Sequence, residues 1–220
     1  MNKKFTVLFD LDGTLIDSFD QITECCLRVR NAMKMKNLSK RELTGLIGLP
    51  VEHLFSDNPS DVIQTAVRLF RIELSNEIER ENHAFEGAFE LLNALKQQGV
   101  GIAVATSKPH PLALKVIDNS SLREFVDCVQ GIDGFAPKPD PEVVIRCQNK
   151  LLADKFVMLG DRPEDIQAGL RSGCYSVGIA QGVFGESQLK KAGAQETYES
   201  LVGLLDNLES FLSSVQAYGD

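Results

Sequence analysis

The sequence of 220 residues lacks the features of several protein classes. The first apolar run meets Asp10 after five residues. It is too short to cross a bilayer or to form the apolar part of a secretory signal. We therefore expect a cytoplasmic protein without a membrane partner. Lys and Arg number 23 against 31 Asp and Glu, a net charge of -8 that would repel a phosphate backbone. Nucleic acid is therefore not an expected partner.

The number and spacing of the cysteines and histidines suit neither a disulfide framework nor a zinc site. The five cysteines form an odd set without a CxxC pair, and the three histidines share no metal-ligand spacing. We expect the cysteines to be buried, reduced thiols, since free cysteine packs as a small apolar residue. These cysteines are Cys25, Cys26, Cys128, Cys147 and Cys174.

Length and composition fit a globular protein with one core and a smaller appendage. The chain exceeds the roughly 100 to 150 residues of a common single domain and falls short of two. Apolar residues make up 43% and charged residues 25%, which argues against disorder or a fibre. No internal repeat or low-complexity segment is present, and a monomer is the default expectation.

Short apolar runs alternate with segments of helical periodicity. Five runs predict strands, at Phe5–Phe9, Val100–Ala105, Phe125–Val129, Phe156–Leu159 and Tyr175–Ile179. Helical spacing follows, for example, in the segment that begins at Ala88 and ends before Gly99. Such alternation favours an α/β fold, a Rossmann-like doubly wound parallel sheet with helices on both faces. Ligands bind such a sheet at the carboxyl ends of its strands.

Residues 18–84 interrupt this alternation, because they offer helical periodicity and no convincing strand. We predict a helical insert here, with turns at Gly45–Pro50 and Ser56–Ser60 between its helices. The core is then formed by residues 1–17 and 85–220. A last helix, at about Tyr198 to Val215, is predicted to dock on the core.

The first candidate site is Asp10-Leu11-Asp12-Gly13, directly after the first strand. Carboxylates at this position would face a ligand crevice, although an ordinary Asp/Gly turn is the alternative. Asp161, Glu164 and Asp165 follow the Phe156–Leu159 strand in the same way. There the alternative is a helix capping box between Asp161 and Glu164.

Two further candidates are able to bind phosphate. Thr106 and Ser107 end the second strand, where a hydroxyl and the amides that open the next helix can donate hydrogen bonds; a simple helix cap is the alternative. Lys138 lies between Pro137 and Pro139, which restrict the backbone and can fix the cation, although a solvated lysine in a rigid loop fits as well. Any one of these elements could occur by chance, but the occurrence of all of them in one sequence favours a shared function.

The ordered set of Asp10, Asp12, Thr106, Lys138 and Asp161 with Asp165 closely resembles the haloacid dehalogenase-like superfamily, in particular phosphatases such as phosphoglycolate phosphatase. The resemblance spans Phe5 to about Gly178. It implies that the insert is a mobile cap that selects the substrate, and that the turn at Gly45–Pro50 contacts the substrate. From its residues alone, this turn fits a plain connection between helices at least as well. Arg162 departs from the family pattern, where a small residue often follows the acidic one.

The resemblance also implies a mechanism. Asp10 would attack phosphorus and form an aspartyl-phosphate, while Asp12 would protonate the leaving oxygen and then activate water. Thr106, Lys138, Leu11 and Ser107 would bind the phosphoryl group. Mg²⁺ would be held by three ligands, with Asp165 orienting a metal-bound water. These ligands would be the carboxylates of Asp10 and Asp161 and the backbone carbonyl of Asp12.

The expected substrate is a small phosphorylated metabolite, and phosphoglycolate, a sugar phosphate, a nucleotide and pyrophosphate stay open. Asp12 disfavours dehalogenation, because dehalogenase relatives lack this second aspartate. A phosphosugar mutase of the beta-phosphoglucomutase kind is the enzymatic alternative, and a non-catalytic binding domain of the same fold is a further one.

Overall fold

The computed structural model describes residues 5–78 and 83–218, so the ends of the predicted core and residues 79–82 of the predicted insert lie outside it. The described chain contains a six-stranded sheet with the order β3-β2-β1-β4-β5-β6. All its strand pairs are parallel. Its strands are β1 (Thr6–Phe9), β2 (Gly101–Pro109), β3 (Cys128–Ile132), β4 (Phe156–Gly160), β5 (Tyr175–Ile179) and β6 (Glu196–Tyr198). This order is that of the Rossmann fold.

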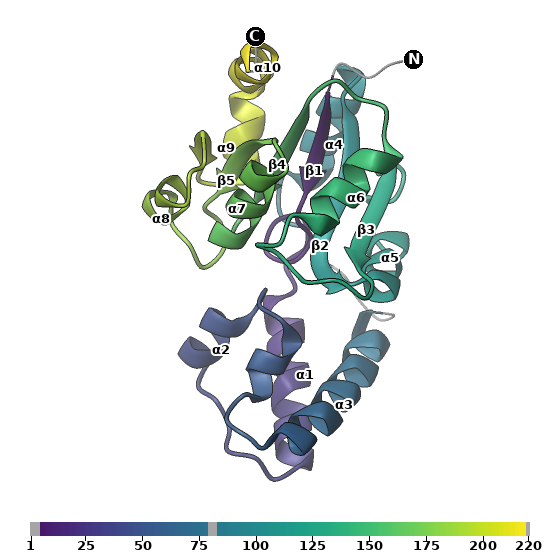
Figure 1. Ribbon diagram of the computed structural model, residues 1–220, viewed down its shortest axis with the longest axis vertical. Coiled ribbons are helices and arrows are strands. Elements are labelled where there is room, and N and C mark those ends of the chain that lie inside the picture. The colour runs from purple at the N-terminus through teal and green to yellow at the C-terminus, as the bar shows by residue number, and fades with distance from the viewer. Residues whose placement is uncertain (1–4, 79–82, 219–220) are drawn as a thin grey trace.

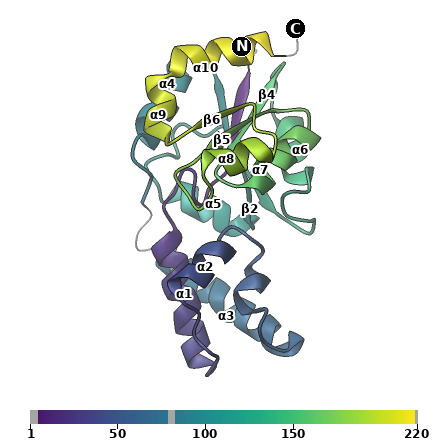
Figure 2. The ribbon, with the colours of Figure 1, turned by 90° about the vertical axis from the view of Figure 1, so that its left-hand side faces the viewer.

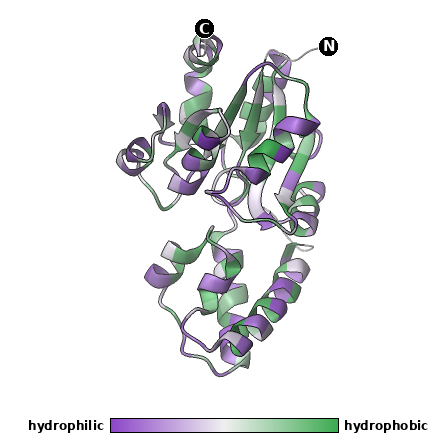
Figure 3. Cartoon of the chain, viewed as in Figure 1, coloured by the Kyte–Doolittle hydropathy of each residue, from purple (hydrophilic) through white to green (hydrophobic). Residues whose placement is uncertain are grey.

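Helices cover both faces of the sheet, which confirms the doubly wound α/β prediction (Figure 1). Alternation within β1 shows why: Val7 and Phe9 pack on one face and Leu8 on the other. The first face carries α4 (Ala88–Gln97), α5 (His110–Asp118), α9 (Leu201–Asp206) and α10 (Leu208–Ala217); the second carries α6 (Glu142–Lys150), α7 (Pro163–Arg171) and α8 (Glu186–Lys191). Strands β1 and β4 at the centre of the sheet are accordingly green, the colour of apolar residues, in Figure 3.

After residue 17 the chain leaves the sheet, and residues 18–78 form a separate group of helices beyond the carboxyl ends of the strands (Figures 1 and 2). Helix α1 leads away from the sheet and α3 leads back. The group consists of α1 (Phe19–Ala32), α2 (Lys40–Leu46), the 3-10 helix η1 (Val51–Phe55) and α3 (Ser60–Ile78). The predicted turns at Gly45–Pro50 and Ser56–Ser60 fall at the α2–η1 and η1–α3 connections.

The two chain segments that join the insert to the sheet lie side by side. Ile16 and Ala84 form an antiparallel bridge. The backbone N–H of Asp17 donates to the carbonyl of His83 at 2.8 Å, and that of Phe85 to the carbonyl of Leu15 at 2.9 Å. The insert therefore enters and leaves the core at one place.

Several elements differ from the prediction, among them β2, which continues to Pro109 instead of ending at Ala105. Strand β3 starts at Cys128 rather than Phe125, because Phe125 and Val126 are buried in the turn before it. The short strand β6 was not predicted, and it ends where the last helix was expected to begin. That helix is also two helices, α9 and α10, which meet at Asn207.

The cysteines are free, as predicted, but Cys128 is only half-buried. Within residues 5–78 and 83–218, no helix has the length and apolar character needed to cross a membrane.

Candidate active site

The candidate site lies where the strand order of the sheet changes direction, at β1. Strands placed after β1 in the chain lie on both of its sides, which opens a crevice at their carboxyl ends. Phe9 of β1 pairs with Leu159 of β4, and the Asp10 N–H donates to the Leu159 carbonyl at 2.8 Å. Asp10 and Asp161, which follow these two strands, are thereby brought together.

Three carboxylates converge in this crevice. One oxygen each from Asp10, Asp161 and Asp165 lies within 4.8 Å of the others, and all three residues are buried. Burial raises the pKa of Asp10 to about 6, against the opposing charge of Lys138. Burial and the neighbouring carboxylates also raise the pKa of Asp161 well above its usual value, although the Thr14 hydroxyl donates to it at 2.9 Å. The cluster holds more negative charge than the protein neutralises.

This cluster suits a hard divalent cation. Mg²⁺ prefers oxygen ligands, usually one or two carboxylates with water and a substrate phosphate, and the cluster offers three carboxylates. Two glycines keep the space next to Asp161 open, since a β-carbon on Gly13 would lie 2.6 Å from Asp161 Oδ2 and one on Gly182 closer still. Gly13 also has a φ of 88°, which favours glycine. The residues therefore fit a magnesium ion bound between Asp10 and Asp161.

Lys138 is a fixed cation and not a solvated lysine, because only 5% of it is exposed. Its Nζ lies 2.6 Å from Asp10 Oδ1 and 2.5 Å from Asp165 Oδ1, and it donates to the Ala105 carbonyl at 3.0 Å. Burial alone would lower the pKa of Lys138, but the two carboxylates raise it above the usual value. Asp165 therefore contacts the lysine directly, a contact that the sequence did not indicate.

Asp12 is paired with Lys108, which sequence reasoning missed. Lys108 Nζ lies 2.8 Å from Asp12 Oδ2, and Lys108 is only 8% exposed. The other carboxylate oxygen, Asp12 Oδ1, is buried and has no hydrogen-bond partner among the described residues. Asp12 also lines the cavity beside Asp10, so its carboxyl group is placed to exchange a proton with a bound molecule.

Thr106 and Ser107 line the crevice, although no helix begins directly after them. Strand β2 continues to Pro109, which is the N-cap of α5, so the helix-cap alternative for Thr106 and Ser107 is wrong. A contact between phosphate and the amides that open α5 stays a prediction. The Lys108 N–H donates to Thr106 Oγ1 at 3.2 Å, and the Lys138 N–H donates to Ser107 Oγ at 3.3 Å.

Leu11 differs from the other predicted phosphate ligands. Its side chain is fully buried in the core, and it is not among the residues that line the cavity. Only its backbone is therefore left to contact a ligand.

Arg162 connects the site to the insert. Its Nη1 donates to the carbonyl of Ile47 in the α2–η1 loop, its Nε lies 3.3 Å from Glu164, and its guanidinium stacks 4.9 Å from the centre of the Phe184 ring. The capping-box alternative for Asp161 and Glu164 is wrong, because Arg162 is the N-cap of α7 and its N–H donates to Asp165 at 3.0 Å.

A cavity of about 300 Å³ lies between the sheet and the insert. Its sheet side carries Asp10, Asp12, Thr106 and Lys138, while its insert side comes from α1, the α2–η1 loop, η1 and α3. Asp161 lies behind this wall, next to Asp10.

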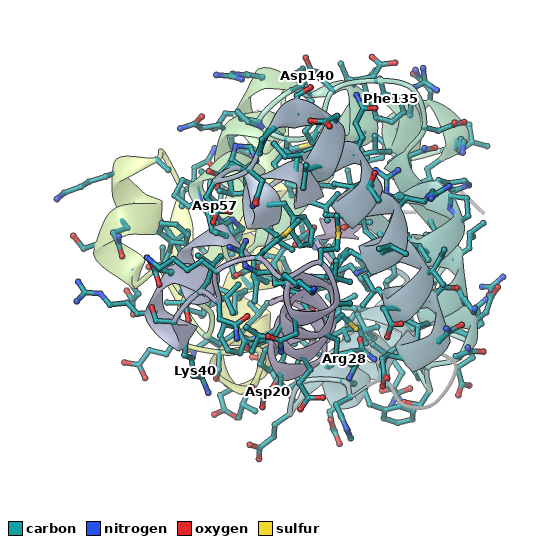
Figure 4. All side chains as sticks on the ribbon, turned by 90° about the horizontal axis from the view of Figure 1, so that it is seen from below. Asp20, Arg28, Lys40, Asp57, Phe135 and Asp140 are labelled. Carbon is teal, nitrogen blue, oxygen red and sulfur yellow. The ribbon has the colours of Figure 1, made fainter. Side chains whose placement is uncertain are left out.

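Most charges of the insert lie on its outer surface. In Figure 4, Asp20, Lys40 and Arg28 lie at the margin opposite to Phe135 of the sheet domain. Lys40 pairs with Asp20 at 3.8 Å, and Arg28 pairs with two glutamates of α3. Arg71 and Glu52 line the cavity instead, and Arg30 is fully buried.

A family model described as haloacid dehalogenase-like hydrolase matches residues 7–179. Among curated relatives, the probable phosphatase IndB of Dickeya dadantii is 31% identical over 225 residues, covering 96% of this chain and 98% of that protein. Pyrophosphatase PpaX of Halalkalibacterium halodurans is 28% identical over 204 residues, covering 91% and 95%. The crystal structure of a predicted phosphatase from Clostridium acetobutylicum superposes with a TM-score of 0.82 at 26% identity, covering 97% of this chain and 100% of that one.

Proposed function

The chain belongs to the haloacid dehalogenase-like hydrolase family, as a phosphatase, and from this premise we propose that it hydrolyses a small organic phosphomonoester with Mg²⁺ and an aspartyl-phosphate intermediate. The observation that carries the proposal is the convergence of the Asp10, Asp161 and Asp165 carboxylates, the first and last of which contact Lys138 Nζ. A phosphate dianion and a carboxylate repel each other, so attack requires compensating positive charge.

Asp10 is the proposed nucleophile. Its carboxylate oxygen forms a bond to phosphorus as the bond between phosphorus and the leaving oxygen breaks. Asp10 lines the cavity beside Lys138, and the lysine neutralises part of the charge that develops on the phosphoryl oxygens. Thr106 and Ser107 hold the phosphoryl group from the β2 side. The backbone of Leu11 is proposed as a further phosphate contact.

Asp12 is the proposed acid and base. Its carboxyl group lines the cavity; it gives a proton to the leaving oxygen in the first step and takes one from water in the second. That water then attacks phosphorus, Asp10 is released, and inorganic phosphate leaves. Magnesium, held by the Asp10 and Asp161 carboxylates and the Asp12 carbonyl, supplies charge neutralisation at the phosphate when it is bound. Asp165 holds Lys138 and is the proposed orienting group for a metal-bound water.

The insert, residues 18–84, is the proposed substrate-selecting cap on a core of residues 1–17 and 85–220. Its α2–η1 loop supplies part of the cavity wall opposite to Asp10 and Asp12, which supports the proposal. The cytoplasmic location and the monomeric state stay predictions from the sequence.

Phosphate release tests the proposal. We expect the protein to release phosphate from small phosphomonoesters with Mg²⁺, to lose this activity in EDTA, and to lose roughly a thousandfold or more in kcat upon Asp10→Asn. Asp118→Asn, an exposed carboxylate on α5 that pairs with Arg123, is the matched control and should be unaffected. Equal activity of Asp10→Asn and the wild type would remove the nucleophile assignment.

The same assay addresses the alternatives. A phosphosugar mutase returns the phosphoryl group to another sugar hydroxyl, and a binding domain turns over nothing. Stoichiometric release of phosphate into solution therefore separates the phosphatase from both.

A further inference from the structure

The cavity is lined by charged residues on its sheet side and mainly by apolar residues on its insert side, and this difference indicates which phosphate esters it accepts. We propose that the site selects the phosphate ester of an uncharged, largely apolar alcohol, over diphosphates, phosphorylated carboxylic acids and sugar phosphates. This inference rests on the proposed function, because it concerns the leaving group of the same reaction. It is carried by the charges and the apolar side chains of the described residues around the cavity.

Each cation among the described residues that line the cavity already has a carboxylate partner. Lys138 is held by Asp10 and Asp165, and Lys108 lies 2.8 Å from Asp12. The two arginines are also paired. Arg162 lies 3.3 Å from Glu164, and Arg71 lies 3.8 Å from Glu52.

A second anionic group on the substrate therefore meets cations whose charge is already partly neutralised, and it gains less attraction from them than it would from free cations. Lys108 is the cation nearest to the proposed acid, Asp12, and both members of this pair are largely withdrawn from solvent, with side chains 5% and 12% exposed. Breaking such a pair costs free energy, because both charges lose their partner while they are largely withdrawn from water. A carboxylate or phosphate on the leaving group is therefore disfavoured.

The insert side of the cavity is lined mainly by hydrocarbon. It presents Ile22, Leu49, Leu54, Phe70 and Leu74, and its charged side chains among the described residues are Glu52 and Arg71. These two are about half exposed. Sugar hydroxyls would face this wall without partners, and an unpaired buried hydroxyl lowers affinity. An apolar body gains contact area there instead.

The wall is fixed in place by two buried arginines. Arg30 is fully buried, and its guanidinium donates to the Leu54 carbonyl at 2.8 Å and pairs with Asp57 at 2.6 Å. Arg162 donates to the Ile47 carbonyl from the sheet side. Preorganised walls select by shape and polarity, and a volume of about 300 Å³ restricts the ester to a small one.

The test compares kcat/KM values at fixed Mg²⁺ concentration for five compounds. Benzyl phosphate and n-butyl phosphate are the uncharged, apolar esters; phosphoglycolate, pyrophosphate and glucose 6-phosphate are the competitors. We expect each apolar ester to exceed every competitor by about tenfold or more. Pyrophosphate has the best leaving group of the five compounds. Leaving-group reactivity alone would therefore favour pyrophosphate, and a preference for the apolar esters over it would have to come from the cavity.

A charge placed in the wall should shift this preference. Leu49 is half-buried, lines the cavity and lies outside the packed core, so Leu49→Lys adds a cation without opening the core. We expect it to lower the ratio of kcat/KM for benzyl phosphate to that for phosphoglycolate by about tenfold or more. Leu152→Lys adds the same charge at a position 82% exposed and outside the cavity lining, and should leave the ratio unchanged.

The outcomes separate the two proposals. A wild-type preference for phosphoglycolate, pyrophosphate or glucose 6-phosphate overturns this inference and leaves the phosphatase proposal standing. Equal ratios in Leu49→Lys and Leu152→Lys also overturn it, because the wall would then play no part in selection. Hydrolysis of none of the five, with Mg²⁺ present and the protein folded, overturns the proposed function and this inference with it.

Discussion

Lys138 neutralises two buried carboxylates, and Lys138→Met removes its charge while keeping most of its volume. Its Nζ lies 2.6 Å from Asp10 and 2.5 Å from Asp165, and only 3% of the side chain is exposed. Removing one partner of a buried ion pair costs about 3–5 kcal/mol, because the remaining charge is left uncompensated. A chain of this size loses about 2–4 °C in Tm per kcal/mol, so the expected decrease in Tm is roughly 6–20 °C at pH 8 in EDTA.

Thermal unfolding at two pH values measures this effect. The loss should be smaller at pH 5, since Asp10, whose pKa is raised to about 6 by burial, then carries a proton and no longer requires a cation. Lys190→Met is the control, because Lys190 is 60% exposed and pairs with Glu186 at 3.2 Å, an exposed pair that contributes about 0–1 kcal/mol. An equal loss in Lys138→Met and Lys190→Met at pH 8 would refute the assignment of Lys138 as the neutralising cation.

Three further predictions concern the metal site and the insert. Because the pKa of Asp10 is raised from 3.8 to about 6, this group contributes stability that is fully present below pH 3.8 and is lost as pH rises through about 6. Loss of the proton also makes the Asp10 carboxylate available to bind metal, so Mg²⁺ should raise the Tm more at pH 7.5 than at pH 5. Gly13→Ala should weaken Mg²⁺ binding in calorimetric titration, because its methyl group would lie 2.6 Å from the Asp161 carboxylate. Arg162→Ala should lower kcat/KM roughly tenfold or more, since it removes a charged hydrogen bond to the α2–η1 loop.

Each of these predictions has its own control. A Tm shift by Mg²⁺ that is equal at both pH values would contradict the first. Gly99→Ala shares a positive φ with Gly13→Ala, 73° against 88°, but its methyl group meets nothing within 4 Å; equal Mg²⁺ affinity in the two variants would contradict the second. For the third, Arg146→Ala removes an exposed arginine that pairs with Glu142, and matching kinetics in the two arginine variants would count against the loop contact.

The sheet and most of the candidate site were predictable because their signals are local. Buried strands such as β1 and β4 are continuous apolar runs, and the residue after each run lies at the carboxyl edge of the sheet by geometry alone. Asp10 and Asp161 could therefore be placed side by side before any coordinates were known. β6 has three half-buried residues and no periodicity, so it left no signal of this kind.

What could not be predicted depends on contacts between distant segments. Lys108 has the sequence signature of a solvated lysine, and only its approach to Asp12 across the crevice shows otherwise. Arg162 was noted as a departure, but the Ile47 carbonyl that it contacts is 115 positions away in the chain. The apolar wall of the cavity combines α1, η1 and α3, whose inward faces are set by helix packing and not by any short motif.

The bridge between Ile16 and Ala84 bears on how such an enzyme can diversify. Because the chain departs and returns at neighbouring positions, the intervening segment can be exchanged, lengthened or shortened while the register of every strand stays the same. Reaction chemistry and substrate preference can then evolve separately, the first constrained by the sheet and the second free to drift with the helices.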